Sequence, residues 1–133
     1  MTHTPVDRRE ALALMAQVPV GRVVVTEGAL PAVHPVLFAL DGDRVVFRAY
    51  TGSVLARAAH DSVVAFQADC IDVTERTGWT TTITGRSTRV ADPVEVERLD
   101  RLLPLGPNED EYSWFCITSE FVTGRRTRRS GPE

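Results

Sequence analysis

Hydrophobic and polar residues alternate along most of this chain with the short period of β-strands, and only a few stretches show the longer period of a helix. Near the start, four apolar side chains recur at helical spacing opposite charged ones. This pattern predicts a short amphipathic helix over residues 7–15, with Asp7 as its N-cap. Pro19 interrupts it, and the β-branched residues that follow predict a strand over residues 22–26.

The clearest local pattern is a hairpin in the first half of the chain. Two apolar runs cover residues 32–40 and 44–49, and Asp41-Gly42-Asp43 separates them. Asp and Gly at this spacing favour a tight turn between two antiparallel strands. Further strands are predicted over residues 62–68 and 80–90, where Gly85 marks a bulge or a close approach of another backbone.

Two more helices are predicted between these strands. Ser53 stands at an N-cap position before the alanine-rich residues 54–59, which predicts a short helix. Asp92-Pro93 opens a longer one that Pro104 and Gly106 close, since proline is favoured at the first helical position. Residues 108–111 are predicted to form a loop.

The end of the chain predicts a last strand or a bent pair of strands, over residues 114–118 and 120–123. The fold class is therefore mainly β with short α-helices. A six-stranded, mostly antiparallel sheet of this length hides its edges best by closing into a small barrel. No predicted helix is long enough for the repeated crossovers of a parallel α/β fold.

Length and charge narrow the class of protein. The chain has 133 residues and a formal net charge of −3. This size predicts one domain spanning residues 1–133, and we expect residues 1–6 and 127–133 to be flexible tails. The net negative charge argues against a nucleic acid partner. The apolar runs fall short of the roughly 20 residues of a membrane span, and no signal peptide pattern opens the chain, so we expect a cytoplasmic protein without a membrane partner.

Few side chains offer catalytic or metal chemistry of their own. Cys70 and Cys116 lie far apart in the sequence without C-x-x-C spacing, which predicts two buried, reduced thiols and no zinc site. No other ligand-type residue stands at metal-binding spacing from His34, and no G-x-S-x-G motif is present. The catalytic residues stay unassigned, as expected where a cofactor performs the chemistry.

The turn at Thr51-Gly52-Ser53 is the best candidate for binding an anion. A Gly-Ser step that leads into a helix presents backbone N–H groups and a hydroxyl, and both suit a phosphate. The alternative interpretation is that Ser53 only caps its helix and Gly52 only makes the turn. The residues alone leave both interpretations open.

Five segments in order, together with one near the end, give the sequence a family resemblance. The segments are Pro19-Val-Gly-Arg22, Pro35-Val36, Val46-Phe47-Arg48 followed by Gly52-Ser53, Val64-Ala-Phe66 followed by Asp69, Gly78-Trp79 followed by Gly85-Arg86, and Val122-Thr-Gly-Arg-Arg126. In this order the sequence resembles the pyridoxamine 5′-phosphate oxidase-like flavin-binding family over residues 8–126. The resemblance implies a six-stranded antiparallel split β-barrel of the FMN-binding type, and a homodimer that binds FMN in a groove shared by both subunits.

The resemblance also implies a set of cofactor-binding residues. The flavin ring would lie against the second strand and the start of the fifth, and the phosphate at the turn. The residues so assigned are Val33, His34, Pro35, Val36, Arg48, Ala49, Gly52, Ser53, Val54, Arg57, Trp79 and Thr80. For Trp79 the alternative is a residue of the core or of a dimer interface, and for His34 it is a hydrogen-bonded structural residue.

The sequence departs from the family at the turn. The family usually has Lys or Arg directly after the Gly-Ser or one residue later, and here Val54 and Leu55 occupy these positions. A charge-assisted contact to phosphate is about twice as strong as a neutral one, so another cation would have to replace it. Arg48 and Arg57 are the nearest candidates, and the alternative for both is an ordinary solvated charge.

Two functions from different classes follow. The first is an FMN-dependent oxidoreductase acting on an unknown small molecule. The second is a non-catalytic flavin-binding module or carrier, which the missing cation favours. The same fold with F420 or haem in place of FMN is a further alternative, because relatives of the family bind these cofactors. No set of basic residues for a substrate phosphate can be placed, so the sequence does not favour vitamin B6 oxidation itself.

Overall fold

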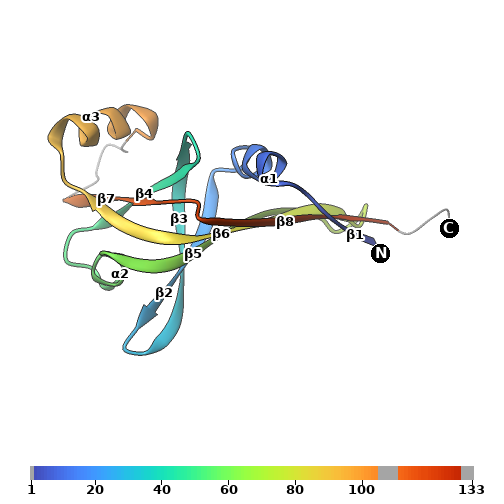
Figure 1. Cartoon of the computed structure of the whole chain (residues 1–133), viewed down its shortest axis with the longest axis horizontal. Helices are drawn as coiled ribbons and strands as arrows, with labels where there is room; N and C mark the ends of the chain where they lie inside the picture. Colours follow the sequence, from blue (N-terminus) through green and yellow to red (C-terminus); the bar gives the residue numbers. More distant parts are fainter. Residues whose placement is uncertain (1, 105–110, 130–133) are drawn as a thin grey trace.

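The computed structural model describes residues 2–104 and 111–129 (Figure 1). Within these residues the chain forms eight strands and three helices. The strands are β1 (Thr2–Pro5), β2 (Val20–Glu27), β3 (Leu30–Asp41), β4 (Arg44–Tyr50), β5 (Ser62–Asp72), β6 (Thr77–Val90), β7 (Tyr112–Ile117) and β8 (Phe121–Arg128). The helices are α1 (Arg8–Met15), α2 (Val54–Ala58) and α3 (Pro93–Leu102).

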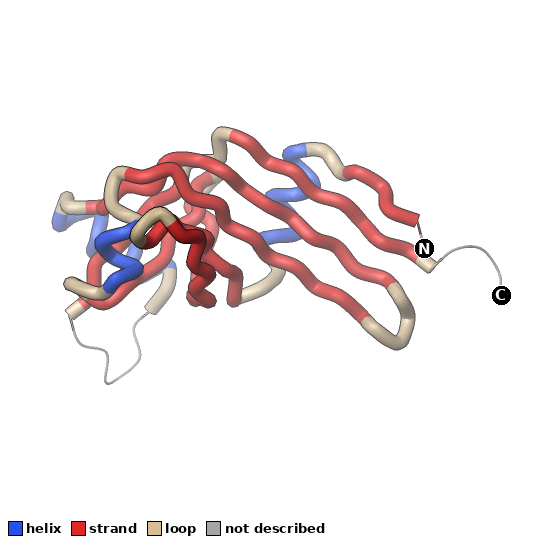
Figure 2. The backbone as a smooth tube through the Cα atoms, turned by 90° about the horizontal axis from the view of Figure 1, so that it is seen from below, coloured by secondary structure: helices blue, strands red, loops and turns tan. Residues whose placement is uncertain are grey.

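Six of the strands close into an antiparallel barrel. The strand order is β1-β8-β6-β5-β2-β3-β4-β7, and a further pairing joins β6 to β7. The strands β6, β5, β2, β3, β4 and β7 therefore form a ring, as the sequence predicted. Beyond the ring, β8 and the short β1 continue the sheet next to β6. Figure 2 shows this extension running out of the barrel toward both chain termini.

The barrel and its extension separate at one position of β6. The first half of β6 pairs with β8 from Gly78 to Thr84, and the last residues pair with β7 from Ser87 to Val90. Gly85 lies between the two pairings. A Cβ atom built on it would stand 1.7 Å from the carbonyl oxygen of Thr118, in the corner that joins β7 to β8. The predicted close approach at Gly85 is confirmed, and only a residue without a side chain permits it.

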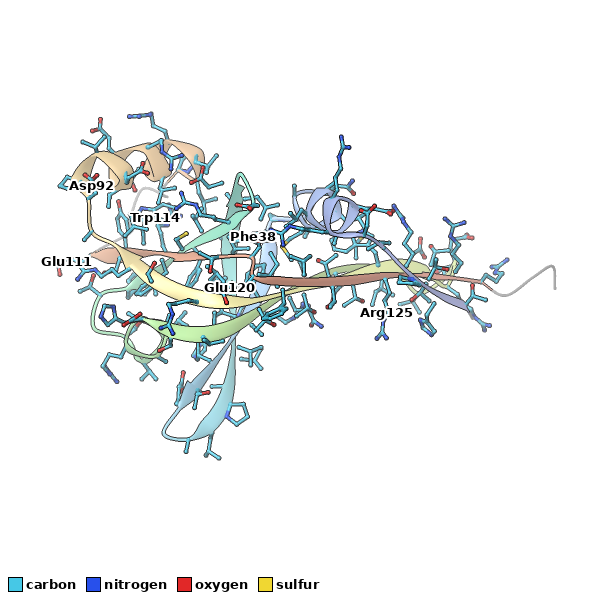
Figure 3. The ribbon with its side chains drawn as sticks, viewed as in Figure 1. Phe38, Asp92, Glu111, Trp114, Glu120 and Arg125 are labelled. Carbon is cyan, nitrogen blue, oxygen red and sulfur yellow. The ribbon has the colours of Figure 1, made fainter. Side chains whose placement is uncertain are left out.

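Strand alternation divides the buried residues into two clusters. On β4 and β7, Phe47 and Phe115 point into the barrel, where their rings stack with centroids 5.5 Å apart. Their neighbours Val46 and Trp114 point outward and pack with Leu99 beneath α3 (Figure 3). Because both faces of these two strands are buried, α3 is fixed to the outside of the barrel at β4 and β7.

The predicted helices and the hairpin are confirmed, including their caps. Carboxylate or hydroxyl oxygens of Asp7, Ser53 and Asp92 accept backbone N–H bonds of 2.8–3.0 Å at the starts of α1, α2 and α3. Gly42 adopts a φ of +65° in the turn between β3 and β4. Both β5 and β6 are longer than predicted. Gly106 and most of the predicted loop at 108–111 lie outside the described residues.

The described part of both chain ends, where flexible tails were expected, lies in paired strands. Thr2–Pro5 forms β1 and pairs with β8 in the register Thr2 to Arg128 and Pro5 to Arg125. The backbone N–H of Val6 also donates to the carbonyl oxygen of Gly124 at 3.0 Å. The first strand was missed because its four residues show no apolar alternation and all are exposed. It is held by backbone pairing and by a side-chain contact of 3.2 Å between His3 Nδ1 and Thr127 Oγ1.

Among the residues that the structure describes, no helix is both long enough and apolar enough to cross a membrane.

Replacing Gly85 with alanine should destabilise the fold by about 3 kcal/mol, because the backbone carbonyl of Thr118 cannot move away from the new methyl group cheaply. Urea unfolding measures the change. Gly42→Ala is the control, since its added Cβ meets no atom within 4 Å and only its positive φ is strained. The expected loss for the control is about 1 kcal/mol. Equal losses in the two variants would contradict the steric explanation.

Candidate functional site

A cleft of about 340 Å³ opens where β3, β4 and α2 meet. It is lined by Pro35, Val36, Leu37, Arg48, Ala49, Tyr50, Ser53, Leu55 and Tyr112. We call it the first cleft. It brings together five of the residues that the sequence assigned to a cofactor, from three separate segments: Pro35, Val36, Arg48, Ala49 and Ser53. Most of its lining is apolar, and Arg48 and Ser53 supply polar groups, a composition typical of ligand pockets.

Arg48 is held in place by its surroundings. Its guanidinium donates hydrogen bonds to the backbone carbonyls of Leu103 and Pro104, just past the end of α3. Its central carbon lies 5.0 Å from the ring centroid of Trp114 and 5.8 Å from that of Tyr112. Such cation–π contacts hold the planar group over the rings. The Arg48 side chain is therefore oriented at the wall of the first cleft before any ligand binds.

The two aromatic rings are themselves fixed by one carboxylate of α3. The hydroxyl of Tyr112 and the indole N–H of Trp114 both donate to Asp100 Oδ1, at 2.7 and 2.8 Å. Burial and this hydrogen bond raise the pKa of Tyr112. The phenol therefore stays neutral and keeps the proton that it donates.

A cluster of charges attaches α3 to the hairpin of β3 and β4. Arg98 donates two hydrogen bonds to the carboxylate of Asp41, at 2.9 and 2.8 Å, and Arg44 donates a third. These bonds, chiefly those from Arg98, hold the pKa of Asp41 far below its usual range. Because the carbonyls that orient Arg48 follow α3 directly, this cluster also positions one wall of the first cleft.

The turn from Tyr50 to Ser53 separates the first cleft from a second one. Gly52 has a φ of +83°, which favours glycine, and its Cα faces open space. Ser53 Oγ accepts from the backbone N–H of Ala56 at 3.0 Å, so Ser53 does cap α2. A hydroxyl that accepts one hydrogen bond still has its own proton to donate. The capping role therefore leaves Ser53 able to donate to a ligand in the first cleft.

Gly52 and Arg57 line the second cleft, which has a volume of about 330 Å³. Its lining is Thr51, Gly52, Ala56, Arg57, His60, Arg89, Ser113 and Phe115. Arg57 donates to the carbonyl oxygen of Gly52 at 2.7 Å. Arg48 and Arg57 were the two candidates to replace the Lys or Arg that is missing after Ser53. Arg48 lies at the first cleft and Arg57 at the second.

Trp79 and Thr80 lie away from both clefts. They line a third cleft of about 490 Å³ near the tip of the β5–β6 hairpin, together with Arg125 (Figure 3). Trp79 is 7% exposed and belongs to the main core cluster. Within one chain, Trp79 and Thr80 therefore lie in a different cleft from Arg48, although the sequence assigned all three to one cofactor site.

The remaining predicted residues line none of these clefts. His34 Nε2 lies 2.5 Å from Glu27 Oε1, which supports its interpretation as a hydrogen-bonded structural residue. Val33 and Val54 are exposed on the surface.

Sequence reasoning missed several lining residues. Tyr50 directly precedes the predicted turn and could have been included on that ground. Tyr112 and Arg89 come from distant segments, and only the pairing of β7 with β4 and with β6 brings them to the clefts. Nothing in the local pattern indicates such a pairing.

The described residues hold no group of three His, Cys, Asp or Glu side chains that could bind a metal ion. Cys116 is buried beneath α3, as predicted, and burial raises the pKa of its thiol. The prediction of burial is wrong for Cys70, which is exposed near the end of β5.

The six-stranded barrel, with a cleft beside the turn after β4, defines a split-barrel protein of the flavin-binding type. The family model described as pyridoxamine 5′-phosphate oxidase matches residues 7–126. The chain therefore belongs to the pyridoxamine 5′-phosphate oxidase family.

Individual relatives agree with this assignment. "Uncharacterized protein Rv0080" of Mycobacterium tuberculosis (strain ATCC 25618 / H37Rv) is 42% identical over 125 residues, which cover 90% of this chain and 82% of that protein. The structure is similar to that of the FAD binding protein from Mycobacterium smegmatis, with a TM-score of 0.81 and 29% identity over 95% of this chain and 98% of the other. The FAD and heme binding protein from the same organism has a TM-score of 0.76 at 18% identity, covering 98% of this chain and 76% of the other, and shows the fold alone.

Replacing Asp41 with asparagine should lower the free energy of unfolding by about 1–2 kcal/mol at pH 7, because it weakens charge-assisted bonds that are partly exposed to solvent. The folded-state pKa of Asp41 is depressed, so its stabilising effect is present above the ordinary pKa of about 4 and is lost as the pH falls below it. Urea unfolding of both proteins at pH 7 and pH 3 should show the difference narrowing at low pH. A difference that does not change with pH would argue against the ion cluster.

Proposed function

We propose that this protein binds a flavin, with its FMN portion in the first cleft, and acts as an oxidoreductase on a small organic molecule. The observation that carries the proposal is the meeting of Pro35, Arg48 and Ser53 in one cleft, because the sequence assigned all three to the cofactor from separate segments. Family membership adds support over most of the chain. So does the name of the Mycobacterium smegmatis relative as an FAD binding protein.

The residues of the first cleft fit the two parts of such a cofactor. Pro35, Val36 and Leu37 offer an apolar wall for a planar ring, and Arg48 and Ser53 offer a guanidinium and a hydroxyl for a phosphate. Arg48 takes the place of the cation missing at Val54. A bound flavin would supply hydride or single-electron transfer, while the protein holds it, orients it and limits access of water.

A second copy of the chain is proposed to complete the site. On the outer face of the sheet, Val20, Val33 and Leu37 are exposed apolar residues of the neighbouring strands β2 and β3. In register, Val33 lies opposite Val24 and Leu37 opposite Val20. Such an exposed apolar patch beside a ligand cleft is typical of an interface.

The same face carries Thr80. Arg22 of β2 pairs with Gln67 of β5, and Gln67 pairs with Thr82 of β6, two residues from Thr80, so these side chains share one face. A homodimer built on this face would bring a second Thr80 toward the first cleft. The distance between the Arg48 and Thr80 parts of the site within one chain is the reason to expect a shared site.

A flavin-binding module or carrier without turnover is the second candidate function. Val54 and Leu55 place no charge beside the turn. Among the described residues that line the first cleft, only the Tyr50 and Tyr112 phenols and the Ser53 hydroxyl are suited to donate a proton. Steady-state oxidation of NADPH by the flavin-loaded protein would decide for the oxidoreductase, and binding without any turnover would decide for the carrier.

Flavin binding can be tested on the purified protein. The visible spectrum should show bound flavin, or the protein should take up FMN or FAD when either is added. Parallel titrations with F420 and haem test the other cofactors of the fold. A colourless protein that takes up neither flavin would refute the proposed function, and tighter binding of F420 or haem would replace the cofactor.

Replacing Arg48 with alanine should weaken FMN binding by about 1.5–3 kcal/mol, as expected for a hydrogen bond to a charged group. Titration of FMN by fluorescence quenching measures the change. Arg101→Ala is the matched control, because Arg101 is an exposed residue of α3 whose ion pair is with Glu97. Thermal unfolding of both variants separates a loss of binding from a loss of fold. Unchanged affinity in a folded Arg48→Ala protein would reject Arg48 as the phosphate partner.

Replacing Val33 with aspartate should convert the dimer to a monomer and lower its flavin affinity. Val33 is 59% exposed in the single chain, so the substitution should leave the barrel intact. Val94→Asp is the control, at a residue that is 73% exposed on α3. Sedimentation velocity gives the oligomeric state of each protein. A wild-type monomer, or a Val33→Asp dimer with normal flavin affinity, would contradict the shared site.

A further inference from the structure

The second cleft lies on the opposite side of the turn from the first. Thr51 and Gly52 of the turn form one part of its lining, and Arg57 and His60 lie in and just after α2. Arg89 of β6 and Ser113 and Phe115 of β7 complete it. Arg89 pairs with Phe115 where β6 and β7 close the barrel. The cleft is therefore built by the barrel closure together with the turn, and its volume of about 330 Å³ can hold a small ligand group.

The charged side chains that line this cleft are all basic. Two of its lining residues are arginines, Arg57 and Arg89, and His60 contributes an imidazole. Within residues 2–104 and 111–129, no carboxylate lines it and none of these three residues forms an ion pair. Most other arginines with a described partner are bound to Asp or Glu. On a chain with a net charge of −3, such a group attracts an anion locally.

The hydrogen-bonding capacity of the cleft also fits an anion. Arg57 uses one N–H to bind the carbonyl oxygen of Gly52 at 2.7 Å. A guanidinium has five N–H donors in all, so this bond orients the group and leaves others to donate. The hydroxyls of Thr51 and Ser113 lie 3.0 Å apart, and one of their two protons is left over for another acceptor. The described lining thus offers several donors to one ligand.

The two clefts share the turn as a common wall. Tyr50 and Ser53 line the first cleft, and the two residues between them line the second. At Gly52, the position of a missing Cβ has no protein atom within 4 Å. A ligand that crosses the turn at Gly52 therefore meets no protein atom at this position.

We propose that the second cleft binds a phosphate group, and that in the flavin-bound protein this is the adenylate phosphate of FAD. The inference rests on the proposed function, with the FMN portion of the dinucleotide in the first cleft. It predicts that Arg57 and Arg89 make the protein prefer FAD to FMN. The same phosphate chemistry could instead come from a separate phosphorylated substrate, and the experiment below distinguishes the two sources.

The test is a set of titrations of the full chain with FAD, FMN and AMP. The wild type should bind FAD at least about tenfold more tightly than FMN, since one or more charge-assisted bonds are added. Arg89→Gln should remove most of this preference and leave FMN affinity unchanged. Arg9→Gln is the control for the charge, because Arg9 is an exposed residue of α1 outside both clefts. It should behave as the wild type.

Each outcome of the AMP titration has a meaning. AMP that competes with FAD but not with FMN supports the dinucleotide. AMP that binds together with FAD, and loses affinity in Arg89→Gln, supports the cleft and assigns the phosphate to a separate substrate. Equal affinities for FAD and FMN, with no binding of AMP, would overturn the inference while leaving flavin binding intact. If neither flavin binds, the proposed function fails, and AMP binding alone then decides whether the second cleft is an anion site.

Discussion

The contact between Gly85 and the carbonyl of Thr118 is the constraint on which the rest of the structure depends. It lets β6 pair with β8 on one side of this position and with β7 on the other. Without the pairing to β7 the six strands would form an open sheet, and Arg89 would not lie beside Phe115 at the second cleft. β6 thus belongs both to the barrel and to its extension, and the absence of a side chain at Gly85 allows it to change partners.

The pairing of β7 with β4 determines how the candidate site is held. With β7 beside β4, the outward-facing Trp114 lies beneath α3, and Asp100 of that helix fixes its indole. Arg48 then lies over the ring and against the carbonyls that follow α3. The cation at the first cleft is therefore oriented by β7 and by the carbonyls after α3. Under the proposed function, Arg48 would do the work of the Lys or Arg that the turn lacks.

The sequence predicted the features that depend on local pattern or on the family resemblance. The caps Asp7, Ser53 and Asp92, the hairpin at Gly42 and the close approach at Gly85 were all readable, because each depends on a residue with a strong local preference. β1 was missed, since its pairing with β8 leaves no apolar pattern. The separation of Trp79 from Arg48, and the presence of Arg89 beside the turn, depend on which strands meet, and neighbouring residues contain no signal for that.

A crystal structure of the protein grown with FAD tests the central claim most directly. The account predicts flavin density in the first cleft, with the ring against Pro35 and Val36 and the phosphate nearest the flavin within hydrogen-bond distance of Arg48 or Ser53. Flavin bound elsewhere on the barrel, or a first cleft that stays empty at saturating FAD, would contradict it.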